Sequence, residues 1–167
     1  EYDAWVYPYF TAYVKDNKVV TWKQSKWVLK DAPKKAIEAY NKAYELDPKT
    51  AEKVKEGLKQ VSDFCSQVGY VEAADAYVTA FEAQSSPAYE KADPALLYYA
   101  GYLLTVDGSN NPKSFAKGGE YLTKAIDLDY ADEEGNIYYY LFHCLYGQKD
   151  LDKGNIMKAK DVLLTGI

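Results

Sequence analysis

The segment AIEAYNKAYELDP, residues 36–48, carries the clearest signal for the fold. Ala36, Tyr40 and Ala43 follow one another at intervals of four and three residues, which places them on one face of a helix. The small residues on that face let a second helix approach closely, and the tyrosine fills the gap between the two helices. Pro48 then closes the segment, because proline does not continue a helix. We therefore predict a helix that packs through this face against a neighbour.

The same order of a small, a bulky and a small residue recurs three more times along the chain. A second helical segment, with apolar residues at a period near that of a helix, precedes three of the four occurrences, at residues 51–69, 94–106 and 136–147. Glycine or proline stands in the turns between them. Strand signals are poor, so we predict repeated helix–turn–helix units. The three further triplets are Ala73, Tyr77 and Ala80; Gly118, Leu122 and Ala125; and Ala159, Leu163 and Gly166.

These units resemble the tetratricopeptide repeat, a helix–turn–helix of 34 residues whose second helix carries alanine and aromatic residues and ends at proline. Residues 36–48 match it best, and IDLDY, residues 126–130, repeats that ending with Tyr130 in place of proline. The intervals between repeats are longer than in that family, which also suits the related Sel1-like repeats. The resemblance implies an all-α fold, a right-handed α-solenoid of about three to four units whose first helices line the concave surface.

The resemblance divides the chain into two parts. Residues 33–167 form the repeat array, and residues 1–32 fit it poorly. In the front part we expect a degenerate first helix with Pro8 near its first turn, followed by a linking helix at residues 22–29. The last helix is expected to be truncated at Ile167, so that a further element would follow in a longer protein.

The composition excludes some classes of partner. The net charge is −5 and the pI about 5.0, and the lysines are scattered among acidic residues, so we expect a solvated surface and no nucleic-acid partner. No apolar run reaches the roughly 20 residues of a membrane span, so we expect no transmembrane segment. Cys65 and Cys144 lie in apolar-periodic segments and are expected to be buried, although the sequence leaves their oxidation open. The missing initiator methionine and the many tyrosines favour the cell envelope over the cytoplasm.

Residues with catalytic chemistry are sparse. His143 is the single histidine, and it adjoins Cys144, so the two side chains diverge by about 100° on a helix. No phosphate-binding or nucleophile motif is present. The acidic loop at residues 127–136 suggests calcium, but Ala131 stands where a loop ligand is needed and the glycine of a calcium loop is missing. We therefore expect no enzymatic activity, no metal and no cofactor.

The tyrosines, 18 in all, carry the main functional signal. The resemblance places Leu97, Gly101 and Leu104 in the core, which turns Tyr98 and Tyr102 towards the concave face. In residues 136–147 the core positions would be Tyr138, Leu141, Phe142 and Leu145. The predicted ligand groove is then lined by Tyr98, Tyr102, Tyr139, His143 and Tyr146. The alternative is that these tyrosines only cover neighbouring helices, with their hydroxyl groups in water.

Polar residues occupy the same face of the helix at residues 51–69. One end of the groove would therefore be charged and the other aromatic, which would suit a ligand with an apolar anchor and a charged tail. The polar residues are Glu56, Lys59, Asp63, Ser66 and Gln67.

Three functions remain in competition. The leading hypothesis is a non-enzymatic scaffold that binds a protein or peptide in the concave groove. The second is a carbohydrate-binding accessory module of the cell envelope, which exposed and coplanar aromatic side chains would favour. The third is that the chain is the helical part of a larger assembly, or associates with itself through its terminal repeats. A long apolar patch on the terminal helix pair would favour this third hypothesis.

Overall fold

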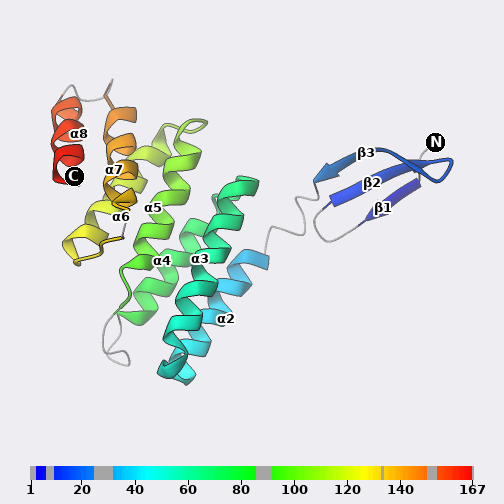
Figure 1. Cartoon of the computed structure of the whole chain (residues 1–167), viewed down its shortest axis with the longest axis horizontal. Coiled ribbons are helices and arrows are strands. Elements are labelled where there is room, and N and C mark those ends of the chain that lie inside the picture. Colours follow the sequence, from blue (N-terminus) through cyan, green and yellow to red (C-terminus); the bar gives the residue numbers. More distant parts are fainter. Residues whose placement is uncertain are drawn as a thin grey trace.

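The computed structural model describes residues 3–6, 10–24, 32–85, 92–132, 134–149 and 154–166. These residues form a small sheet followed by seven α-helices that pack as pairs (Figure 1). All seven helices that the apolar period predicted are confirmed, and the chain is mostly helical. The helices are α2 (Ala32–Leu46), α3 (Ala51–Val68), α4 (Ala73–Gln84), α5 (Ala95–Gly108), α6 (Lys113–Asp127), α7 (Asn136–Gly147) and α8 (Gly154–Thr165), with a short 3-10 turn, η1 (Pro48–Thr50), between α2 and α3.

The front of the chain is not helical. It forms three antiparallel strands in the order β1 (Asp3–Val6), β2 (Phe10–Lys15) and β3 (Lys18–Gln24), which lie apart from the helices in Figure 1. The prediction of a degenerate first helix is therefore wrong for these residues. Of the predicted linking helix, residues 22–24 belong to β3, and residues 25–29 lie outside the described part of the chain.

A two-residue turn explains the sheet. Asp16 and Asn17 both have positive φ, 51° and 58°, which is the conformation of a hairpin turn whose twist matches that of its strands. The residues on either side of the turn are rich in valine, threonine and aromatic side chains, which favour strands over helices. Ala12 and Val14 of β2 are buried on one face of the sheet. The hairpin turn, rather than the helical period, thus determines the local structure here.

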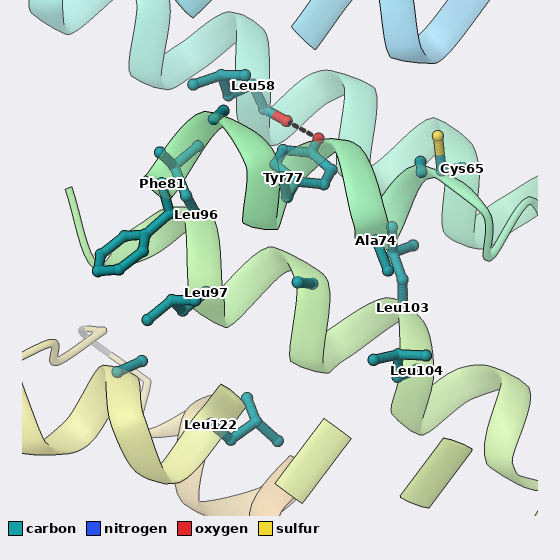
Figure 2. Close-up of a cluster of buried hydrophobic side chains, with 14 of the residues drawn as sticks. Leu58, Cys65, Ala74, Tyr77, Phe81, Leu96, Leu97, Leu103, Leu104 and Leu122 are labelled. Carbon is teal, nitrogen blue, oxygen red and sulfur yellow. Dashed lines mark hydrogen bonds between the residues drawn. The ribbon is translucent and has the colours of Figure 1, made fainter. Parts of the chain in front are cut away.

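The helices pack in an order that brings α3, α5 and α7 side by side. Apart from α3 and α4, each helix packs on its neighbour in sequence, and α3 also contacts α5 while α5 contacts α7 (Figure 1). Side chains bridge α3 and α4: the fully buried Tyr77 reaches across, and its hydroxyl donates a hydrogen bond of 2.7 Å to the Leu58 carbonyl oxygen (Figure 2). Leu96 and Leu97 of α5 complete this core.

Glycines set a close approach of α5, α6 and α7. A Cβ atom added to Gly101 of α5 would lie 2.6 Å from Leu122 Cγ and 3.1 Å from the carbonyl oxygen of Gly118, both on α6. A Cβ atom added to Gly118 would lie 3.2 Å from the sulfur of Cys144 on α7. A larger residue at Gly101 would therefore push α5 away from α6. The predicted core positions Leu97, Gly101 and Leu104 are confirmed as buried.

The small residue at the start of α4 provides a test of this packing. Ala73 is fully buried, whereas Ala83 lies exposed on the same helix. We expect Ala73→Leu to lower the free energy of unfolding by about 1–3 kcal/mol because the larger side chain overpacks the core. The Ala83→Leu control should leave it nearly unchanged. Urea denaturation of both variants measures the difference, and equal stabilities would contradict the assigned packing face.

Candidate functional site

A cavity of about 370 Å³ lies where α3, α5 and α7 meet. Residues of α3 line one side, α5 supplies three tyrosines, and the loop from α6 to α7 together with the start of α7 closes the other side. We call this cavity the tyrosine pocket. Its five tyrosines are Tyr98, Tyr99, Tyr102, Tyr130 and Tyr140, and its other lining residues are Lys59, Ser62, Asp63, Asp132, Glu134 and Asn136.

The tyrosine rings pack on one another across the three segments. The ring centroids of Tyr98 and Tyr130 lie 4.9 Å apart and nearly parallel, and those of Tyr102 and Tyr140 lie 4.8 Å apart with a tilt of 49°. The hydroxyl of Tyr102 also donates a 2.6 Å hydrogen bond to the Ser66 hydroxyl on α3. Offset and tilted ring pairs of this kind are favourable contacts. The rings therefore hold α5 against both α7 and α3 while they form the pocket wall.

The structure brings two of the five predicted groove residues to the pocket. Tyr98 and Tyr102 line it, as predicted, whereas Tyr139, His143 and Tyr146 lie on another face of α7. Tyr139 is 52% exposed and Tyr146 44% exposed, and the ring of Tyr139 contacts that of His143 edge-on, with centroids 4.5 Å apart. These three residues form an exposed aromatic surface beside the pocket rather than part of its lining.

The difference arises from the rotation of α7. Its buried residues are Ile137, Leu141 and Cys144, so that of the four predicted core residues only Leu141 is fully in the core. Cys144 packs closely against Gly118, and this contact turns Tyr140 rather than Tyr139 towards α5. Ile137, Leu141 and Cys144 follow at intervals of four and three residues, but so do Tyr138, Phe142 and Leu145, so the spacing alone does not distinguish the two rotations of α7.

Sequence reasoning missed Tyr99, Tyr130 and Tyr140 as pocket residues. Tyr130 stands at the end of a repeat where proline was expected. It follows a turn in which Asp129 has a φ of 63° and the Tyr130 N–H bonds to the Ala125 carbonyl oxygen, and its ring stacks on that of Tyr98.

Of the five polar residues predicted on the α3 face, two line the pocket, Lys59 and Asp63, and Ser66 bonds to Tyr102. Glu56 and Gln67 are not among the lining residues.

The acidic loop before α7 has a structural role. The carboxylate of Asp132 accepts hydrogen bonds from the backbone N–H groups of Asn136 at 2.7 Å, Ile137 at 2.9 Å and Glu134 at 3.2 Å. It thereby caps the first turn of α7, where free N–H groups attract a negative charge. No group of three or more histidine, cysteine, aspartate or glutamate residues that could hold a metal ion occurs within the described residues.

Burial raises the pKa of several phenols of the pocket. The pKa of Tyr99 is raised to about 12, chiefly by burial and further by the nearby carboxylates of Asp93 and Asp63. Burial likewise raises the pKa of Tyr140 to about 12, followed by its neighbours Tyr102 and Tyr139 and by nearby aspartates. The pKa values of Tyr98 and Tyr130 are also raised, chiefly by burial. At neutral pH every one of these four hydroxyls can donate and accept hydrogen bonds.

The two cysteines are buried, as predicted, and both are free, which the sequence left open. Burial raises the pKa of the Cys65 thiol to about 12 and that of Cys144 to about 11, although a hydrogen bond with Thr105 partly lowers the latter. Neither thiol is therefore poised as a nucleophile near neutral pH. The chemistry of the site lies in its phenols, carboxylates and ammonium group.

The raised pKa values predict a loss of stability at high pH. A phenol with a pKa of 10.0 when unfolded and about 12 when folded stabilises the fold fully below pH 10, and this contribution disappears as the pH rises from 10 to about 12. We therefore expect the ultraviolet absorbance of phenolate to report a late class of tyrosines that includes Tyr99 and Tyr140. The Tyr140→Phe variant should lose one member of that class. A single transition near pH 10 for all tyrosines would contradict the burial of the pocket.

Comparison with models of known protein families, with curated proteins and with solved structures found no match to this chain. Within the described ranges, no helix is both long and apolar enough to cross a bilayer. A function for this chain therefore rests on the geometry of the tyrosine pocket.

Proposed function

We propose that this chain is a non-enzymatic scaffold that binds a peptide segment of a partner protein in the tyrosine pocket. In this proposal the helix pairs form a right-handed solenoid of the tetratricopeptide type, and α3, α5 and α7 are the first helices that line its inner face. The contacts of α3 with α5 and of α5 with α7 support this arrangement. The binding surface would be the pocket and the surface beside it on these three helices.

The observation that carries the proposal is the composition of the pocket wall. Five tyrosines from three separate segments enclose a volume of about 370 Å³, within the range of ligand sites. Tyrosine offers apolar area and a hydrogen-bonding hydroxyl at low entropic cost, which suits peptide recognition. An apolar or long side chain of the peptide would contact the rings, and its backbone would bond to the hydroxyls and to Asn136.

Carbohydrate binding is supported less well. Sugar rings would need an open and flat aromatic platform, whereas the pocket tyrosines are half-buried and contact one another. The ring of Tyr140 is tilted by 49° from those of both Tyr98 and Tyr102. The carboxylates and Asn136 could still bond to sugar hydroxyls, so a glycan remains the second ligand to test.

The test compares two adjacent residues of α7 that receive the same substitution. Peptides selected from a random library on the intact chain would be titrated against Tyr140→Ala and Tyr139→Ala by fluorescence anisotropy. We expect Tyr140→Ala to weaken binding by roughly tenfold or more, as for a central aromatic contact, and Tyr139→Ala to change it little. Equal effects, or a larger effect of Tyr139→Ala, would contradict the pocket as the binding surface.

Folding and ligand class are controlled in the same experiment. Circular dichroism melting of each variant confirms that it is folded, and Tyr140→Phe, which keeps the ring, serves if Tyr140→Ala does not fold. A glycan array read with the same variants gives the competing outcome. The carbohydrate hypothesis would be supported instead if the library yields no binding peptide, and if the intact chain binds a glycan on the array that Tyr140→Ala does not bind.

A separate observation favours participation in a larger assembly. Helix α8 exposes Ile156 at 46%, Met157 at 60% and Leu164 at 63%, an apolar face on the last described helix. Solenoids need polar residues on such terminal faces. If this face covers a second copy of the chain, Met157→Lys with Leu164→Lys should convert a dimer to a monomer in sedimentation velocity. A wild type that is already monomeric at high concentration would contradict self-association.

A further inference from the structure

We propose that the tyrosine pocket selects a positively charged side chain, a lysine or an arginine, in the peptide that it binds. This inference rests on the proposed peptide-binding function and specifies the chemistry of the ligand. It is carried by the charges and the aromatic rings that meet in the pocket.

The pocket has an excess of negative charge. Three carboxylates, those of Asp63, Asp132 and Glu134, line it against the single ammonium group of Lys59. Asp63 lies one helical turn from Lys59, but the two form no ion pair, and Asp63 makes no hydrogen bond to any described residue. The carboxylate of Asp63 is therefore available to a ligand at the edge of the rings.

The same charges act on the tyrosines themselves. Asp132 contributes to the raised pKa of Tyr98 and Tyr130, and Asp63 to that of Tyr99 and Tyr140, in each case after burial. A carboxylate raises the pKa of a phenol because it disfavours a second negative charge nearby. The negative potential thus extends from the rim to the ring hydroxyls, where a cation would be stabilised and an anion repelled.

The aromatic walls favour the same sign of charge. The face of a tyrosine ring carries negative electrostatic potential and attracts lysine or arginine, and the attraction grows when the pair is removed from water. The long apolar stems of these side chains also pack well on aromatic surface while the charged end reaches polar groups. An acidic side chain would meet the ring faces and three carboxylates, of which the first turn of α7 compensates Asp132 and only Lys59 opposes the other two.

The test uses short fluorescein-labelled peptides that are neutral except at one central position, which is lysine, arginine, glutamine or glutamate. Anisotropy with the intact chain should give roughly tenfold tighter binding for lysine or arginine than for glutamine, and weaker binding still for glutamate. Asp63→Asn should reduce this preference, whereas Lys59→Gln should increase it. Glu120→Gln, which removes an exposed carboxylate on α6 outside the pocket, is the matched control and should leave it unchanged.

The outcomes separate this inference from the proposed function. If all four peptides bind equally and Tyr140→Ala weakens them all, peptide binding stands and charge selection is wrong. If none binds, both proposals fail.

Free cations share the chemistry of a basic side chain, so spermidine is tested as a competitor. Displacement of the lysine peptide by spermidine at equal or lower concentration would show that the pocket takes a free polyamine and would overturn a peptide side chain as the ligand.

Discussion

The close approach of α5, α6 and α7 is the contact on which the site depends. It is possible only because Gly101 and Gly118 lack side chains, so that Leu122 and Cys144 fill the space that remains. With α5 held in this way, Tyr98 and Tyr102 lie on the side that faces α3 and α7. With Cys144 of α7 turned inward against Gly118, Tyr140 is carried to the same side. The positions of the pocket tyrosines thus follow from the packing of small residues behind them.

Features that depend on helical spacing, namely the helices and their buried faces, could be predicted from the sequence. The rotation of α7 about its axis and the hairpin at the front of the chain could not. Every described helix was predicted, and the buried face of α5 was predicted correctly from Leu97, Gly101 and Leu104. On α7 almost every residue is apolar or aromatic, so several rotations looked equally good, and the contact of Cys144 with α6 decided among them. At the front of the chain, the two-residue turn at residues 16–17 forms a β-hairpin where a helix was predicted.

The pocket tyrosines hold neighbouring helices together and at the same time line the cavity. Tyr102 joins α5 to α3 through Ser66 and to α7 through the ring of Tyr140, yet it also lines the cavity. The remaining polar groups are arranged around these phenols. Asp132 is fixed by the first turn of α7, and Asp63 has no hydrogen-bond partner among the described residues. If the pocket binds a ligand as proposed, it should change little on binding, because its walls are already held by contacts between helices.

The most direct measurement of this arrangement is a nuclear Overhauser spectrum of the chain with labelled and assigned tyrosine rings. The structure predicts cross-peaks between the rings of Tyr102 and Tyr140, whose centroids lie 4.8 Å apart, and between those of Tyr98 and Tyr130, at 4.9 Å. It also predicts no cross-peak between Tyr102 and Tyr139. Cross-peaks from Tyr102 to Tyr139 but not to Tyr140 would show that α7 is rotated differently, and the tyrosine pocket would not exist in the form described.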